Sequence, residues 1–167
     1  MIVVVGCGNP TRCDDGVGPE IVRRLRARAA EGCDPYLRSA DLRLIDAGTD
    51  GMAAMFAARG CHSLIIVDAC RTGAPPGAVF EVPGTELEQG YTPAFNLHDF
   101  RWDHALHAGH QIFREAFPSD VVVLLIEAES VVFGDDLSVP VTRAATIVVD
   151  RITELVRVRL DDASQRC

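Results

Sequence analysis

No apolar run in the chain reaches the roughly 20 residues that a membrane-spanning helix requires, so the sequence predicts no transmembrane segment. Basic residues are also fewer than acidic ones, 16 against 24. The net charge of −8 argues against a nucleic-acid partner and against an anionic membrane surface, because phosphate groups attract faces rich in Lys and Arg. The chain enters a strand-like run without a basic segment or a cleavage site, so we expect no signal peptide and a cytoplasmic location.

None of the six cysteines belongs to a C-x-x-C pair, which argues against a structural zinc site. A cytoplasmic location predicts that the thiols are reduced. A G-x-S-x-G nucleophile motif is absent as well. Cys7 stands between two glycines, which favours exposure, but no histidine lies near it in the sequence. Nucleophilic catalysis is therefore poorly supported, and the sequence assigns no role to Cys7 or Cys13.

The 167 residues suffice for one domain with a substantial core but not comfortably for two. No internal repeat or low-complexity linker divides the chain. We therefore predict a single, monomeric domain over residues 1–160, followed by a mobile tail over residues 161–167.

Short apolar, β-branched runs alternate with stretches of helical periodicity. Strands are predicted at 2–5, 42–45, 63–67, 78–82 and 121–126, and helices at 17–30, 52–58, 102–117 and 141–160. This alternation predicts an α/β fold whose mainly parallel sheet carries helices on both faces. The strand at 78–82 follows its predecessor through a Gly/Pro-rich turn that leaves no room for a helix, so we expect it to be antiparallel.

Ligands of open parallel sheets bind beyond the carboxyl ends of the strands. Polar residues that follow the predicted strands should therefore gather at one edge of the sheet. They are Asn9, Asp14, Asp15, Asp46, Thr49, Asp50, Asp68, Arg71, Glu127 and Glu129, joined by Asn96, His98 and Asp99 from the mid-chain loop.

Three of these residues form a candidate metal site. Asp15, Asp68 and His98 come from separate loops and would offer two carboxylates and an imidazole, a set that suits a first-row divalent ion and leaves positions open for water or substrate. Each residue also has an ordinary interpretation when taken singly. An Asp at a helix start often caps the helix, an Asp after a strand can cap a turn, and a lone loop histidine is commonly just polar.

The Gly-rich stretch after the first strand raises a competing interpretation, a dinucleotide site. Gly6 and Gly8 fit the G-x-G-x-x-G pattern, but Thr11 occupies the third glycine position. Asp14 and Asp15 would repel a phosphate at the helix start, so we favour a different role for the glycines. They are expected to form a tight turn, braced by the side chain of Asn9, that presents the two acids.

Within that turn Asp14 is the better candidate for the helix cap, which would leave Asp15 to reach a metal. Gly16 and Gly18 are expected to leave space for a peptide substrate beside Asp15.

A second group of ionisable side chains, His104, His107 and His110, recurs every three residues on one helical face. This face could ligate a metal, but a solvated face is the simpler interpretation, and its role stays open.

Five segments together resemble one known family in the order in which they occur. They are "GCGNPTRCDDGVGPEIV", "DAGTDGM", "LIIVDAC", "NLHDF" and "GDDLSVPV". In this set the chain resembles the maturation endopeptidases of nickel–iron hydrogenases, from Ile2 to about Leu160.

The resemblance implies a three-layer α/β/α fold around a five-stranded sheet. It implies one proteolytic cut, which removes the C-terminal extension of the hydrogenase large-subunit precursor after nickel has been inserted. The metal-contacting and catalytic residues carried over are Asp15, Asp68 and His98, the same three that the sheet edge had selected. The nickel is expected to arrive in the substrate, where it could act in catalysis or only as a recognition mark.

The segment from Asp46 to Thr49 resembles the family stretch that is tied to the choice of hydrogenase. Substrate binding is therefore expected to involve Asn9, Asp46, Gly48 and Thr49. Two other functions stay open at this point: a metal-dependent maturation chaperone that binds a hydrogenase without cutting it, and a nucleotide-binding α/β enzyme. Neither the particular large subunit nor a general base follows from the sequence.

Overall fold

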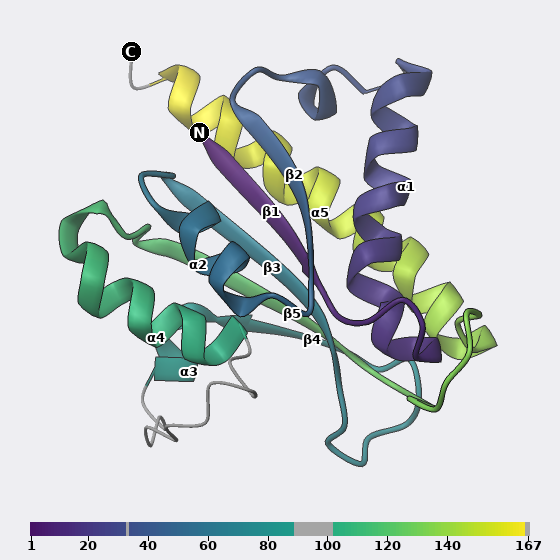
Figure 1. Ribbon diagram of the computed structural model, residues 1–167. Helices are drawn as coiled ribbons and strands as arrows, with labels where there is room; N and C mark the ends of the chain where they lie inside the picture. The colour runs from purple at the N-terminus through teal and green to yellow at the C-terminus, as the bar shows by residue number, and fades with distance from the viewer. Residues whose placement is uncertain (33, 89–101, 166–167) are drawn as a thin grey trace.

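The structure is a computed structural model that describes residues 1–32, 34–88 and 102–165, and strands alternate with helices along it (Figure 1). The strands are β1 (Ile2–Cys7), β2 (Leu42–Gly48), β3 (Ser63–Cys70), β4 (Val79–Pro83) and β5 (Asp120–Glu127). The α-helices are α1 (Val17–Glu31), α2 (Gly51–Ala58), α3 (Gly84–Glu88), α4 (Trp102–Phe113) and α5 (Val139–Gln165). Single 3-10 turns are η1 (Cys13–Gly16), η2 (Tyr36–Arg38) and η4 (Arg114–Ala116).

The five strands form one sheet in the order β2-β1-β3-β5-β4. Three pairs in it are parallel, and only β4 runs antiparallel, against β5. This confirms the predicted sheet, including its single antiparallel member, because the turn between β3 and β4 contains no crossover helix that would return the chain to its starting edge.

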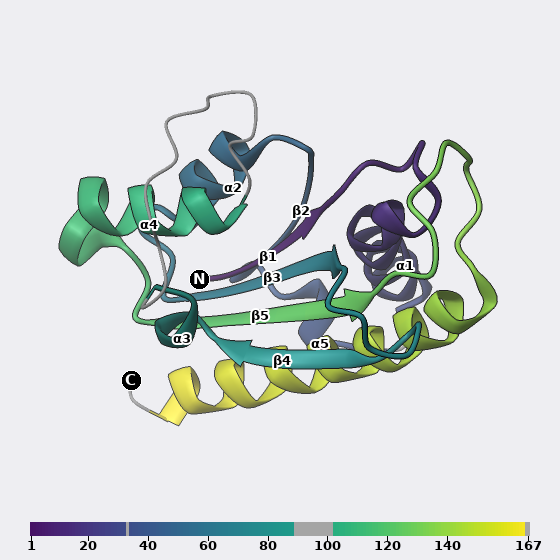
Figure 2. The same ribbon diagram turned by 90° about the horizontal axis from the view of Figure 1, so that it is seen from below.

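Helices cover both faces of the sheet, which gives the three layers that were expected (Figure 2). Helices α1 and α5 pack on one face against every second residue of β1, such as Ile2 and Val4. Helices α2 and α4 pack on the other face against the alternate residues Val3 and Val5. All four of these side chains are buried because a central parallel strand is covered on both sides, and burial of a Val or Ile stabilises the fold by about 1.5–3 kcal/mol.

Local sequence signals set two of the helix boundaries. Gly32 ends α1 in the left-handed conformation, with φ of 76°, and its N–H donates to the carbonyl of Ala29. Asp50 caps α2 by accepting hydrogen bonds from the N–H groups of Met52 and Ala53.

Some boundaries differ from the predictions. Helix α5 begins at Val139 and continues to Gln165, past the predicted end near Leu160, because neither Gly nor Pro occurs in it after Pro140 of its first turn. The one-turn helix α3 lies where a loop was predicted, since a single turn has too few residues to show periodicity. Strand β3 runs on to Cys70, so Asp68 lies inside the strand rather than after it. None of the described helices has the length and apolar character that crossing a bilayer requires.

The topology places a natural ligand position between β1 and β3. From β1 the chain proceeds to β2 on one side and then crosses over to β3 on the other, with α1 and α2 on opposite faces (Figure 2). The chain leaves β1 towards β2 at one edge and leaves β3 towards β4 at the other edge. The loops after β1 and β3 therefore part in opposite directions, which is where open sheets form a ligand-binding crevice.

Candidate active site

Two acidic residues, Asp15 of the turn after β1 and Asp68 of β3, lie close to Gly8. A Cβ atom added to Gly8 would stand 1.8 Å from the carbonyl oxygen of Asp15 and 3.4 Å from Oδ1 of Asp68. The turn that carries Asp15 and the strand that carries Asp68 thus meet at the crevice between β1 and β3, as the strand-end argument had predicted.

The turn itself has the predicted shape. Gly8 has φ of 123°, a conformation that favours glycine, and its N–H donates to the carbonyl of Gly48 at the end of β2. The side-chain oxygen of Asn9 accepts hydrogen bonds from the N–H and the hydroxyl of Thr11 at 3.0 and 2.8 Å. Asn9 therefore braces the turn through its side-chain amide group, and it does so at the point where the chain leaves the sheet.

The carboxylate of Asp15 is oriented by the same turn. Its Oδ2 accepts a hydrogen bond of 3.0 Å from the backbone N–H of Asn9. Asp15 is half-buried, and among the residues that the structure describes its Oδ1 has no hydrogen-bond donor. One oxygen is thus fixed while the other is available to a ligand.

Asp68 is nearly buried, with 6% of its surface exposed, and its Oδ1 accepts a hydrogen bond from the N–H of Ala69. A buried carboxylate stays ionised only where polar or cationic groups interact with it. The Asp68 carboxylate thus lies close to the turn that carries Asp15, and carboxylate oxygens are among the ligands that a divalent cation takes.

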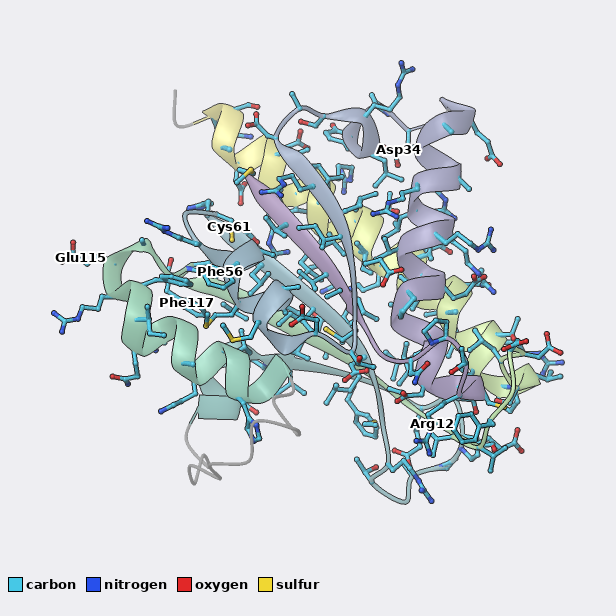
Figure 3. The ribbon with its side chains drawn as sticks, in the orientation of Figure 1. Arg12, Asp34, Phe56, Cys61, Glu115 and Phe117 are labelled. Carbon is cyan, nitrogen blue, oxygen red and sulfur yellow. The ribbon has the colours of Figure 1, made fainter. Side chains whose placement is uncertain are left out.

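A pocket of about 360 Å³ opens beside this pair. It is lined by Arg12, Asp15, Ala69, Cys70, Arg71 and Val131. The predicted site residues at its wall are Asp15 and Arg71, whereas Arg12 and Val131 were not selected from the sequence. The only sequence feature that could have identified them is their position: Arg12 lies in the same turn as Asp15, and Val131 lies shortly after β5. Figure 3 labels Arg12 at this end of the molecule, opposite Glu115 and Phe117.

Asp14 does not cap α1, contrary to the prediction. The residue at the cap position is Gly16, and no side chain bonds to the free amides there. Asp14 is fully buried, its Oδ2 accepts hydrogen bonds from the N–H groups of Glu129 and Ser130, and its Oδ1 accepts one from the N–H of Ser138. The carboxylate therefore ties both ends of the loop after β5 to the turn that carries Asp15.

Glu127 holds a second loop at the pocket. Its carboxylate accepts hydrogen bonds from the N–H and hydroxyl of Thr72 and from the N–H of Gly73. The N–H of Thr72 in particular lowers the pKa of Glu127 to about 2. Burial raises the pKa of the neighbouring Cys70 thiol to about 12, with help from its hydrogen bond to Glu127. Cys70 therefore stays protonated near neutral pH and is not an activated nucleophile.

The glycines at the start of α1 leave no room for a substrate, which corrects another prediction. A Cβ on Gly18 would stand 2.2 Å from the carbonyl oxygen of Cys7 and 2.6 Å from that of Val67. A Cβ on Gly16 would stand 2.8 Å from Cα of Pro10. The protein's own backbone fills this space, and these glycines let α1 pack closely on the sheet.

The residues predicted to bind substrate lie on the same rim. The side chain of Asp46 is exposed and accepts a hydrogen bond from the N–H of Gly48, and Thr49 is exposed next to it. Gly48 has φ of 53° and, through its carbonyl, joins this rim to Gly8. Asp46 also borders a second cavity, of about 520 Å³, whose lining includes Pro10, Gly16 and Asp135.

The third proposed ligand, His98, lies outside the described residues, as do Asn96 and Asp99. Within residues 1–32, 34–88 and 102–165, no three His, Cys, Asp or Glu side chains form a group that could hold a metal ion. The acid pair therefore needs a further donor to complete such a site.

The remaining candidates are less suited to chemistry. Cys7 is only 6% exposed, so the expectation that its flanking glycines expose it was wrong: its side chain belongs to the apolar cluster on the face of the sheet that α2 covers. His104 and His107 are half-buried and His110 is exposed, with its ring stacked 5.5 Å from that of Phe117. The histidine face is thus only partly solvated.

The fold is that of an open-sheet α/β protein, and Asp15 and Asp68 lie at the carboxyl edge of its sheet. A family model described as hydrogenase maturation protease matches residues 19–155. The chain belongs to the hydrogenase maturation protease family.

Curated relatives agree with this assignment. The chain is 32% identical over 108 residues to the coenzyme F420 hydrogenase subunit delta of Methanothermobacter thermautotrophicus, a match that covers 64% of this chain. It is 30% identical over 86 residues to the hydrogenase expression/formation protein HupD of Thiocapsa roseopersicina, which covers 52% of this chain. The matched part spans 65% and 36% of the length of these two relatives.

Solved structures share the fold. The hydrogenase maturating endopeptidase HybD from E. coli superposes with a TM-score of 0.76 over 95% of this chain and 93% of its own, at 20% identity. The nickel–iron hydrogenase maturation protease HycI from Thermococcus kodakarensis gives a TM-score of 0.70 over 94% and 92% of the two chains, also at 20% identity.

Proposed function

We propose that this protein is an endopeptidase that removes the C-terminal extension of a nickel–iron hydrogenase large-subunit precursor after nickel insertion. The observation that carries the proposal is the meeting of Asp15 and Asp68 at Gly8, in a chain of this family. Neither acid is needed to cap the neighbouring helix, and one oxygen of Asp15 faces no donor among the described residues.

The nickel is part of the substrate in this proposal. Asp15 and Asp68, with His98, would add ligands to a metal that the precursor brings, so that only a nickel-loaded precursor is held with its extension at the crevice. Arg71 stands on the pocket wall next to Asp15, and its guanidinium offers several donors to a carbonyl oxygen of the bound segment or to the carboxylate that cleavage releases.

No side chain of the pocket supplies an obvious nucleophile. The thiol of Cys70 is protonated, and the carboxylate of Glu127 is fully occupied by Thr72 and Gly73. A water molecule is therefore the proposed attacking group. The role of the two acids would be to hold the metal of the precursor so that the scissile bond lies next to this water. The negative charge that develops on the carbonyl oxygen would face a cationic group of the pocket wall, such as Arg71.

The test is to incubate nickel-loaded and nickel-free precursors with the protein and to measure the intact masses of both. We expect the loaded precursor alone to lose the mass of its extension. A stable complex without any loss of mass would instead identify a non-cleaving chaperone. Nucleotide binding has less support. A phosphate bound after the second glycine would need the backbone N–H of Asn9, and this N–H already donates a hydrogen bond to Asp15.

A further inference from the structure

The loop that follows β5 exposes two large apolar side chains next to the pocket. Val132 is 64% exposed and Phe133 is 83% exposed, a larger fraction than that of any other large hydrophobic residue in the described part of the chain. Exposed apolar surface is unfavourable in water, so a fixed apolar projection on a loop points to a contact that covers it.

This loop is held rigidly. The carboxylate of Asp14 binds it at Glu129 and Ser130 and again at Ser138, as described above. Between these anchors, the N–H of Cys13 donates to the carbonyl of Gly134 at 2.7 Å, and the N–H of Gly134 donates to the carbonyl of Thr11 at 3.0 Å. The turn and the loop thus form one unit joined by backbone hydrogen bonds.

Arg12 fixes the ring of Phe133 within this unit. Its Nε donates to the carbonyl of Val131 at 3.1 Å, and its guanidinium lies over the ring of Phe133, 5.3 Å from the centroid. A Cβ on Gly134 would approach the sulfur of Cys13 to 2.8 Å, so the loop next to Phe133 packs tightly against the turn. Pre-positioned aromatic side chains lose little entropy on binding, which is why they are common at the centres of protein interfaces.

The apolar projection is continuous with the candidate active site. Arg12, whose guanidinium lies over the Phe133 ring, and Val131, two residues before Phe133, line the same pocket as Asp15. A protein chain whose segment occupies that pocket would therefore have Val132 and Phe133 beside it.

We propose that Val132 and Phe133 form a docking ridge that contacts an apolar surface of the large-subunit precursor beside the segment to be cleaved. This inference rests on the proposed function for the identity of its occupant. The ridge contributes to affinity for the precursor, whereas Asp15 and Asp68 act on the metal and the scissile bond.

The test compares Phe133→Ala with the matched control Ile112→Ala. Ile112 is 63% exposed in the last turn of α4, next to the η4 turn that Figure 3 labels at Glu115, at the end of the molecule opposite Arg12. Precursor processing is followed under single-turnover conditions at increasing protein concentration, and precursor binding is measured separately in the processing-deficient Asp15→Asn background.

For Phe133→Ala we expect the half-saturating concentration and the dissociation constant both to rise about tenfold or more. A loss of affinity of this size is typical of an aromatic residue at the centre of an interface. The maximal rate should not change. Ile112→Ala should leave both constants unchanged, and Phe133→Leu should restore most of the affinity. Because Phe133 is so exposed, the melting temperature should not change.

Equal affinities of the two alanine variants would overturn the proposal, as would a lower maximal rate with unchanged affinity. A dimer of the wild type that Phe133→Ala converts to a monomer would also overturn it, since the ridge would then serve a second copy of this chain. If the wild type binds the precursor but never cleaves it, the proposed function is wrong. The dissociation constants of the variants would then still test whether Val132 and Phe133 form a docking ridge. If the wild type does not bind the precursor, both fail.

Discussion

The backbone N–H of Asn9 lies 3.0 Å from Oδ2 of Asp15 and donates a hydrogen bond to it. This bond closes the turn after β1 onto its own acidic residue. A glycine-rich turn of this kind offers amides to an anion, and here the anion is a carboxylate of the chain itself. The turn therefore presents a negative charge at the crevice.

Replacing Gly8 by Ala should abolish processing. The new Cβ would collide with the carbonyl oxygen of Asp15, and Gly8 also has φ of 123°, so the turn must move and take Asp15 with it. Intact-mass analysis of the precursor measures the loss. The control is Gly60→Ala, where φ is 73° but nothing lies within 4 Å of the added atom. It should cost only about 1–2 kcal/mol of backbone strain and keep processing activity. Micromolar binding of NAD or ATP to the wild type, lost in Gly8→Ala, would contradict this account.

Asp15→Asn and His98→Ala should each stop processing without unfolding the protein. The Asn side chain retains an oxygen that can accept the hydrogen bond from Asn9 but has no charge to offer a metal. Circular dichroism and melting temperature should match the wild type, while the precursor mass stays unchanged. Wild-type rates in both variants would show that these residues do not form the site.

Asp14→Ala should destabilise the protein and loosen the site together. It leaves three backbone N–H groups without their acceptor, and each unsatisfied buried group costs about 1–3 kcal/mol. Urea denaturation gives the loss in unfolding free energy. The exposed acid Asp135 on the same loop serves as the comparison, and its replacement by Ala should change stability by no more than about 0.5 kcal/mol. Equal effects of the two substitutions would contradict the anchoring role of Asp14.

The acid stability of the protein should depend on Glu127. Folding lowers the pKa of this carboxyl from its ordinary value of 4.5 to about 2, because Thr72 and Gly73 donate hydrogen bonds to the charged form. The stabilisation is thus fully present above about pH 4.5 and is lost as the pH falls towards 2. Urea midpoints over this range should fall more steeply for the wild type than for Glu127→Gln, which lacks the titrating group. Parallel curves for the two proteins would refute this linkage.

Thiol chemistry should be dispensable. The pKa of Cys70 is about 12, raised by burial and by its bond to Glu127, so Cys70→Ala should process the precursor at a rate close to that of the wild type. Iodoacetamide near neutral pH should not inactivate the wild type through Cys70 either, because little of this thiol is ionised. Rapid inactivation that Cys70→Ala prevents would assign a catalytic role to this residue after all.

The sequence predicted the fold and the edge of the sheet at which Asp15 and Asp68 lie better than it predicted the contacts around them. The edge could be predicted because strand ends are visible as apolar runs, and parallel topology brings the carboxyl ends of the strands to one edge. The helix boundaries at Gly32 and Asp50 were readable for a similar reason, since caps depend on neighbours within a few residues.

Asp14 shows why the remaining contacts were not predictable. Its position before a helix suggested a local cap, but its partners are amides near residues 129 and 138, and no periodicity links such distant positions. Gly18 was misinterpreted for the same reason. Only the packing of α1 on the sheet reveals that the carbonyls of Cys7 and Val67 occupy the space beside it.

The hydrogen bonds that the Asp14 carboxylate accepts connect positions 115 to 124 residues apart. On the ribosome, the turn bearing Asp15 emerges long before the amides that anchor it have been synthesised. Such high contact order makes closure of this region one of the last events of folding. A nascent chain should therefore be unable to cleave anything, and competence should appear abruptly once the C-terminal helix has docked.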